Sequence, residues 1–177
     1  MHSRRLVYIS GAPGSGKTSL AVPLAAELGF ALLAKDRVKE TLHASLGGGA
    51  EVDQEWSRRL GAASMELLWA LAADAPAVIL EANFWSDDQR VKDRLAELAA
   101  QPVEVFCACP AAELARRYSE RAPARSAVHR DESQLRALGE IIARSDHPVG
   151  VGAVITVDTT KPVDVALVAA QVRTLLP

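Results

Sequence analysis

The sequence is poor in cysteine and has no long apolar run. Its two cysteines, Cys107 and Cys109, both lie in the apolar stretch 103–109, so we expect buried thiols in a reducing compartment and no disulfide framework. The first apolar stretch, residues 6–9, is too short for a signal sequence or a membrane span. These absences predict a cytoplasmic protein with no membrane partner.

An excess of charge of either sign is also missing. The 20 lysines and arginines against 22 aspartates and glutamates give a formal net charge of -2. Proteins that bind nucleic acid by neutralising its phosphates usually carry a basic face, so this balance argues against that class but leaves a local basic strip open. The 177 residues, 49% of them hydrophobic, are enough to build one core, and we expect a single domain over residues 1–177.

Short apolar runs alternate along the chain with segments of helical apolar spacing. The expected strands are residues 6–9, 30–34, 77–80, 103–109 and 153–157. The expected helices are residues 19–28, a segment ending near residue 46, residues 51–73, about 86–100 with Ser86 as N-cap, 110–118, 135–143 and 163–176. Strands that are apolar throughout are typical of a parallel sheet covered on both sides. The pattern predicts an α/β fold: a doubly wound, five-stranded parallel sheet with helices on both faces.

The turn between the first strand and the first helix carries the most specific motif of the chain. Its residues match G-x-x-x-x-G-K-[ST] and are Gly11, Ala12, Pro13, Gly14, Ser15, Gly16, Lys17 and Thr18. Glycines let backbone amides converge on phosphate oxygens, and the following helix N-terminus, with Ser19, adds positive potential. We expect Lys17 to bridge the β- and γ-phosphates and Thr18 to offer its hydroxyl to a metal ion. The implied cofactors are ATP and Mg²⁺.

The segment after the second strand supplies a candidate catalytic base. A carboxylate there opens beside the phosphate site of a parallel α/β sheet, so Asp36 is placed to accept the proton of an acceptor hydroxyl. Arg37 and Lys39 are candidates for holding an anionic acceptor. The alternative is that Asp36 only caps the helix and that both cations are solvated.

The end of the third strand supplies further candidates. Glu81 should reach the carboxyl edge of the sheet, where it could hold Mg²⁺ through water or orient the acceptor. Asn83, Phe84 and Trp85 are predicted to shape the acceptor pocket, although the two aromatic residues could equally belong to the core. Arg90, in the next helix, is a further candidate for an anion contact.

A series of arginines follows the fourth strand and predicts an arginine-rich lid at about residues 116–132. The series consists of Arg116, Arg117, Arg121, Arg125 and Arg130. Such a lid would exclude water and stabilise charge on the transferred phosphoryl group, with Arg121 and Arg125 as its clamp and Arg117 on the nucleotide. The alternative is a solvated helix face balanced by neighbouring carboxylates. Thr159, after the fifth strand, is expected near the adenine, and His129, inside the lid, could meet the substrate.

Together, the loop 11–18, Lys35-Asp36-Arg37, the strand end 80–84 and the arginines 117, 121 and 125 resemble a group of small P-loop kinases. The group includes chloramphenicol phosphotransferase, zeta toxins and the kinase domain of phage polynucleotide kinase. The resemblance implies that Asp36 is the catalytic base and that Arg121 and Arg125 bind phosphates. Many relatives carry an aspartate where this chain has Glu81.

The expected function is transfer of the γ-phosphoryl group of Mg-ATP to a hydroxyl of a small-molecule acceptor. The acceptors of the resembling group range from antibiotics to nucleotide sugars to nucleic-acid ends, so the resemblance leaves the acceptor open among antibiotics, sugars and nucleosides. One alternative is a polynucleotide 5′-hydroxyl kinase, for which Arg37, Lys39 and Arg90 would have to form a cationic channel. The other is a nucleotide-binding regulatory ATPase without an acceptor. The sequence does not assign an oligomeric state.

Overall fold

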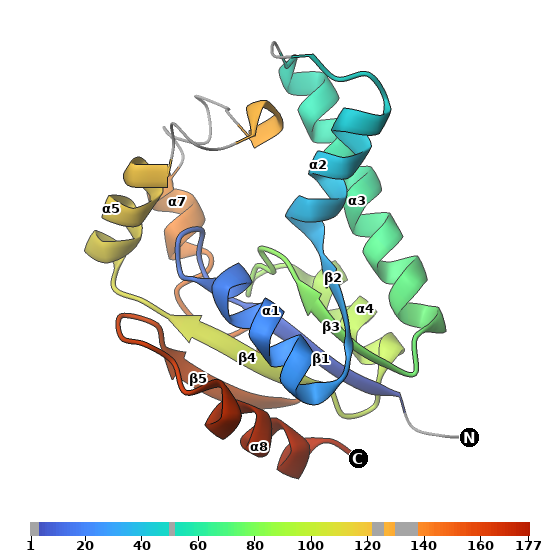
Figure 1. The fold of residues 1–177 in the computed structure, drawn as a ribbon, viewed down its shortest axis with the longest axis vertical. Helices are drawn as coiled ribbons and strands as arrows, with labels where there is room; N and C mark the ends of the chain where they lie inside the picture. The colour runs from blue at the N-terminus through green and yellow to red at the C-terminus, as the bar shows by residue number, and fades with distance from the viewer. Residues whose placement is uncertain (1–3, 50–51, 122–125, 130–137) are drawn as a thin grey trace.

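Five parallel strands form one sheet in the computed structural model, which describes residues 4–49, 52–121, 126–129 and 138–177 (Figure 1). The strands are β1 (Arg5–Ser10), β2 (Ala31–Ala34), β3 (Ala77–Glu81), β4 (Val103–Ala108) and β5 (Ala153–Asp158). Their order is β2-β3-β1-β4-β5, and every neighbouring pair is parallel. Strands β2 and β3 lie on one side of β1, and β4 and β5 lie on the other. The chain therefore builds one half of the sheet first and then crosses to the other half, so the carboxyl end of β1 lies where the winding reverses. Ligands of open α/β sheets bind at such a point.

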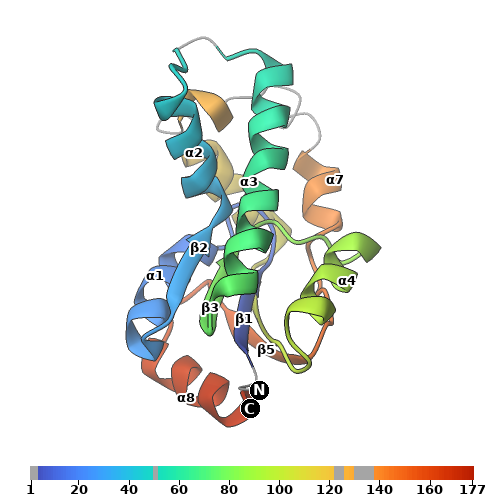
Figure 2. The same cartoon turned by 90° about the vertical axis from the view of Figure 1, so that its right-hand side faces the viewer.

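Helices cover both faces of this sheet, as the sequence predicts. The described helices are α1 (Lys17–Leu28), α2 (Lys35–Ser45), α3 (Gln54–Asp74), α4 (Gln89–Leu98), α5 (Ala111–Arg121), the 3₁₀ turn η2 (Ala127–His129), α7 (Leu138–Ala143) and α8 (Val165–Leu175). Helices α1 and α8 pack on one face, and α3 and α4 on the other (Figures 1 and 2). None of the helices in the described ranges is both long and apolar enough to cross a bilayer.

The central strand β1 shows why the sequence produces this layered arrangement. Successive side chains of a strand point to opposite faces. Leu6 and Tyr8 enter the core against α3 and α4, whereas Val7 and Ile9 enter the core against α1 and α8. All four side chains are fully buried, so the strand needs an uninterrupted apolar run rather than an alternating one.

Aspartate residues cap the starts of α3, α4 and α8, and the cap of α4 corrects one predicted boundary. The predicted cap Ser86 does not start α4, which begins three residues later. The Asp88 carboxylate accepts hydrogen bonds from the backbone N–H groups of Arg90, at 3.0 Å, and Val91, at 3.4 Å. This carboxylate accepts the N–H groups of the first turn and also neutralises the positive helix end. The Ser86 hydroxyl instead donates to the carbonyl oxygen of Arg144 at 3.1 Å.

The two cysteines differ in exposure, which corrects a second expectation. Strand β4 ends at Ala108, so only Cys107 is a strand residue. The Cys107 side chain is buried, and burial raises the pKa of its thiol to about 12. Cys109 lies beyond the strand and is half-buried, and neither cysteine is in a disulfide.

Phe84 belongs to the core, which corrects its assignment to the acceptor pocket. Its side chain is 1% exposed. The ring meets Tyr8 edge-on, with centroids 5.8 Å apart, and lies 5.9 Å from the Trp69 ring. Aromatic pairs of this geometry add to the stabilisation from burial. The chain direction after β3 turns Phe84 towards α3, a contact that depends on tertiary packing.

We expect Phe84→Ala to lower the free energy of unfolding by about 3–5 kcal/mol, because it removes a buried ring and leaves a cavity. Urea denaturation monitored by circular dichroism measures the change. Leu71→Ala, at a side chain 48% exposed on α3, is the matched control and should change the value by about 0.5 kcal/mol or less. Equal effects of the two substitutions would contradict the core assignment of Phe84.

Candidate active site

The loop between β1 and α1 has a backbone that glycine alone can adopt without strain. Gly11, Gly14 and Gly16 have φ values of 123°, 88° and 85°. A Cβ atom on Gly11 would lie 2.7 Å from the carbonyl oxygen of Cys107. Gly16 is the N-cap of α1 and provides no side-chain cap, so the first-turn amides of the helix face the loop without one. This is the arrangement by which helix N-termini bind phosphate groups.

Two side chains of the loop point to the same ligand chemistry. The Lys17 side chain is buried, and its ammonium donates hydrogen bonds to the carbonyl oxygens of Gly11 at 2.8 Å and Ala12 at 3.0 Å. The Ser15 hydroxyl is also buried and has no hydrogen-bond partner among the described residues. Buried hydroxyls are normally satisfied, so this one fits a site that accepts a polar group such as a phosphate oxygen.

Glu81 ends β3 directly beside this loop. Its backbone pairs with Ile9 of β1 in the register of the sheet, and its side chain is 5% exposed. The Thr18 hydroxyl donates to Glu81 Oε2 at 3.3 Å. A hydroxyl and a carboxylate are the oxygen ligands that Mg²⁺ uses beside nucleotide phosphates, so Thr18 and Glu81 fit that ion.

Asp36 reaches the same site from a more distant strand. It lies in the first turn of α2, immediately after the edge strand β2. A cavity of about 230 Å³ opens between this helix, the loop and the end of β3. Its lining residues are Pro13, Gly14, Gly16, Lys17, Thr18, Asp36, Glu81, Ala82, Asn83 and Tyr118. The structure therefore brings Asp36, Glu81 and Asn83 together with the loop.

The pKa values of the two carboxyls in this cavity are shifted in opposite directions. For Asp36, partial burial acts to raise the pKa, but the positive charges of Lys35, His129 and Lys17 outweigh it and hold the pKa below its usual value. For Glu81, burial is again the largest effect, the Asp36 charge adds to it, and the pKa is raised despite the opposing charge of Lys17. Two carboxyls whose pKa values are shifted apart are typical of sites in which one carboxylate stays ionised and accepts a proton.

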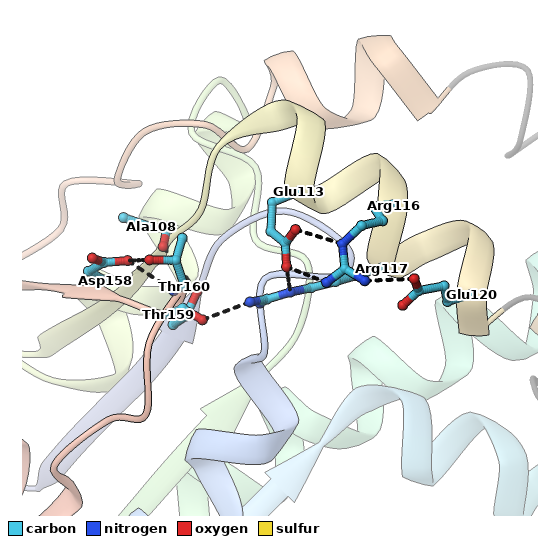
Figure 3. Close-up of polar contacts among 8 residues, drawn as sticks. All are labelled: Ala108, Glu113, Arg116, Arg117, Glu120, Asp158, Thr159 and Thr160. Atoms are coloured by element: carbon cyan, nitrogen blue, oxygen red, sulfur yellow. Dashed lines mark hydrogen bonds and ion pairs between the residues drawn. The ribbon is translucent and has the colours of Figure 1, made fainter.

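A second cavity, of about 280 Å³, shares Gly16 of the loop with the first one. It is lined by residues that include Ser19, Arg117 and Thr159, all predicted to bind the nucleotide. Figure 3 shows Arg117 held between two partners: its Nη2 donates to the Thr159 carbonyl at 3.0 Å, and its Nε donates to Glu113 at 2.6 Å. The Thr159 hydroxyl donates to the Ala108 carbonyl at 3.0 Å. These contacts hold the Arg117 guanidinium among the residues that line this cavity.

Three other predicted substrate contacts are not brought to the first cavity. Arg37 is exposed. Lys39 is buried, and its ammonium donates to Ser57 Oγ at 2.8 Å and to the Val128 carbonyl at 3.1 Å, so it joins structural elements instead of lining the cavity. Arg90 is exposed on α4 and lines a separate groove with residues of α3 and α4.

Trp85 and Arg116 each have a partner outside the first cavity. The Trp85 ring lies beneath the Arg144 guanidinium, 3.7 Å from it, and is not among the residues that line the first cavity. Arg116 is paired with Glu113 and Glu120, at 2.7 and 2.6 Å, on the exposed side of α5, which supports the solvated-face alternative for this residue. Arg125, Arg130, much of the predicted lid and the side chain of Arg121 lie outside the described residues.

Tyr118 is a cavity residue that the sequence did not reveal. It is 6% exposed and comes from α5, which follows β4. Helix α5 packs closely on the loop: a Cβ atom on Gly14 would lie 3.1 Å from the Leu114 carbonyl oxygen. The sequence signal that could have identified Tyr118 is its spacing of four residues from Leu114, which places both side chains on one helix face.

Glu81→Gln should stabilise the fold at neutral and alkaline pH. A carboxyl whose folded pKa is raised contributes stability below its unfolded pKa, and this stability is lost as the pH rises through the folded pKa. Glutamine removes the buried charge but can still accept the Thr18 hydrogen bond. The melting temperature should rise by a few degrees at pH 8, since 1 kcal/mol corresponds to about 2–4 °C in a chain of this size, and the gain should vanish near pH 4.

Calorimetric melting at pH 4, 6 and 8 measures this effect. Glu97→Gln is the matched control, because the Glu97 side chain is 67% exposed and pairs only loosely with Arg94, at 3.6 Å. A lower melting temperature of Glu81→Gln at pH 8 would show that the ionised carboxylate stabilises the fold. That result would contradict the predicted rise in melting temperature.

The chain is similar to known proteins over most of its length. A family profile described as "AAA domain" matches residues 6–144. Among solved structures, a candidate kinase from Chloroflexus aurantiacus is 29% identical with a TM-score of 0.80, covering 99% of this chain and 100% of that one. Comparison with curated protein sequences gave no significant match.

Two solved structures at lower identity share the fold. A gluconokinase from Sinorhizobium meliloti is 19% identical with a TM-score of 0.61, covering 97% of this chain and 91% of that one. An APS kinase from Mycobacterium tuberculosis, in complex with AMPPNP and APS, is 23% identical with a TM-score of 0.55, covering 99% and 98%. Since the profile spans the phosphate-binding loop, Asp36 and Glu81, the chain belongs to this AAA-domain family and has the fold of the small P-loop kinases.

Proposed function

We propose that the protein is an ATP-dependent phosphotransferase that transfers a γ-phosphoryl group to a hydroxyl of a small-molecule acceptor. The observation that carries the proposal is the first cavity. Its walls combine the phosphate-binding loop with two carboxylates and one amide: Asp36 follows β2, whereas Glu81 ends β3 and Asn83 follows it. A nucleotide-binding site needs only the loop, whereas a transferase also needs a base and polar groups for a second substrate.

The residues have separate roles in the proposed transfer. Asp36 accepts the proton of the acceptor hydroxyl as its oxygen bonds to the γ-phosphorus, and the electron pair of the broken P–O bond leaves with ADP. Lys17 balances the negative charge of the phosphates. Asn83 offers an amide to the acceptor. Most of the rate enhancement comes from positioning and charge stabilisation.

Thr18 and Glu81 are the residues that would hold Mg²⁺, which supplies charge neutralisation at the phosphates when bound. Support for ATP as phosphoryl donor comes from the APS kinase of the same fold, which was solved with AMPPNP. The second cavity, with Ser19, Arg117 and Thr159, is the proposed position of the adenine.

The position of the cations favours a small acceptor over a nucleic-acid end. The polynucleotide kinase alternative needs Arg37, Lys39 and Arg90 in one channel. Within the described part of the chain, Arg37 is exposed, Lys39 is buried and Arg90 lines a groove on α3 and α4. The antibiotic, sugar and nucleoside classes are therefore the first to test.

A coupled ADP-release assay against a panel of aminoglycosides, phenicols, sugars, sugar acids and nucleosides tests the proposal. We expect one class to raise ADP release at least tenfold above the basal rate, with one phosphate appearing on the acceptor for each ADP. A 5′-hydroxyl oligonucleotide with γ-labelled ATP is included as a separate arm.

The three outcomes separate the alternatives. Label in the oligonucleotide would support the polynucleotide kinase instead of the small-molecule kinase. Slow ATP hydrolysis that no acceptor stimulates would support the regulatory ATPase. Absence of nucleotide binding in calorimetry with Mg²⁺ present would remove the nucleotide from the function altogether.

A further inference from the structure

The turn η2 lies against α2, the helix that carries Asp36 (Figures 1 and 2). It is separated from α2 by more than 80 residues of sequence, yet the Val128 side chain is 1% exposed and the His129 side chain 7% exposed. The backbone N–H of His129 donates to the Ser126 carbonyl at 2.9 Å, which closes the turn. A short segment of this kind becomes buried only where other elements hold it.

A buried hydrogen-bonded anchor holds this turn. The Val128 carbonyl accepts from the Lys39 ammonium at 3.1 Å and from the Ser57 hydroxyl at 2.9 Å. Lys39 in turn donates to Ser57 at 2.8 Å. Since Lys39 is on α2 and Ser57 on α3, three elements meet at one carbonyl oxygen. Burying a lysine to 3% exposure is costly. The hydrogen bonds of Lys39 to Ser57 and Val128 offset this cost and hold the turn in position.

The anchor places the His129 imidazole over one face of α2. Its Nε2 lies 3.2 Å from Glu40 Oε1. Asp36, Lys39 and Glu40 are spaced three and four residues apart, so they share this face. The His129 charge is also among the three that lower the pKa of Asp36. The imidazole thus contacts the carboxylate that lies one turn beyond the candidate base, on the same helix face.

We propose that His129 is a positioning residue of the acceptor site: the Lys39–Ser57 anchor holds its imidazole on the face of α2 that carries Glu40 and, one turn before it, the candidate base Asp36. The inference rests on the proposed function, in which Asp36 is the base. Lys35 and Lys17 act on Asp36 in the same direction as His129. Two further carboxylates lie close by: Glu40, which contacts His129, and Glu81, whose pKa the Asp36 charge raises. His129 is the member of this set that comes from the segment between α5 and α7.

The first test needs no acceptor. The carboxyl carbon resonance of Asp36, assigned from its loss in Asp36→Asn, is followed by NMR through an acid titration. In His129→Gln, which keeps a hydrogen-bonding side chain but removes the charge, we expect the pKa of Asp36 to rise towards its ordinary value. His147→Gln is the matched control, since His147 contacts Ser86 and Asp146 instead, and it should titrate like the wild type.

The second test uses the acceptor found in the panel. His129→Gln should lower kcat/KM for the acceptor about tenfold and leave the KM for ATP unchanged, because the residue acts on the acceptor side only. Ser57→Ala removes one of the two donors to Val128 and should shift Asp36 and kcat/KM in the same directions by a smaller factor. It also serves as the second variant where His129→Gln does not fold.

The outcomes keep this inference separate from the proposed function. An unchanged Asp36 titration in a folded His129→Gln or Ser57→Ala protein overturns the inference, whatever the panel shows. A shifted titration in a protein that phosphorylates no acceptor would support the position of His129 while the kinase proposal failed. A rise in the KM for ATP would place His129 on the nucleotide side and contradict the inference.

Discussion

Lys17→Met should abolish nearly all phosphoryl transfer, with a loss of about 10²- to 10³-fold in kcat. The Lys17 ammonium is buried within the loop, where it now donates to two loop carbonyls, at 2.8 and 3.0 Å. A charge in so enclosed a position is preorganised for the phosphates and is screened little by solvent. Methionine keeps the length and volume of the side chain, so the loop should remain folded.

The affinity for Mg-ATP should fall as well. Losing a charge-assisted hydrogen bond costs about 1.5–3 kcal/mol, which corresponds to a roughly 10- to 150-fold higher Kd in calorimetry. Lys92→Met is the control, because Lys92 lies on α4 outside both cavities. If Lys17→Met bound and turned over ATP like Lys92→Met, the loop would not be the nucleotide site.

Asp36→Asn should separate catalysis from nucleotide binding. We expect kcat for the acceptor to fall about 10²- to 10⁴-fold, the range found when a general base is removed. The Kd for Mg-ATP should stay within a factor of about two, because Asp36 lies on α2, outside the loop whose amides are proposed to bind the phosphates. Asparagine preserves the shape of the side chain but cannot accept the proton.

Stopped-flow or quench-flow measurement of product formation, together with calorimetry, checks both halves of this prediction. Asp93→Asn on α4 is the matched control, since its carboxylate accepts a hydrogen bond from Gln89 on the protein surface, at 2.8 Å. Phosphoryl transfer that survives in Asp36→Asn would remove Asp36 from the mechanism. A large rise in the Kd for ATP would instead place Asp36 in the nucleotide site.

The predictions that succeeded concern features set by local sequence or by strand direction. The loop 11–18 combines required glycines with a strand before it and a helix after it, all within a short segment. The meeting of Asp36 and Glu81 at the loop followed from one rule, that the carboxyl ends of parallel strands share an edge. The structure confirms that meeting in the cavity the three segments line.

The predictions that failed concern side chains whose surroundings come from distant segments. Phe84 and Asn83 are neighbours in the chain, yet one is buried against Tyr8 and Trp69 and the other lines the cavity. Lys39 was predicted as a substrate contact because it belongs to the segment after the second strand, which opens beside the phosphate site. Its partner, the Val128 carbonyl, is 89 residues away in the sequence, and no local sequence pattern indicates such a pairing.

The sequence by itself determined the alternation of strands and helices, the phosphate-binding loop and the order in which the carboxylates reach the sheet edge. These depend on backbone propensity, apolar periodicity and glycine geometry, which act over a few residues. Only the tertiary structure decided which cations face the cavity, that Tyr118 lines it and that η2 is anchored on Lys39 and Ser57. Burial and charge neutralisation depend on every element packed around a group, so they are properties of the folded chain as a whole.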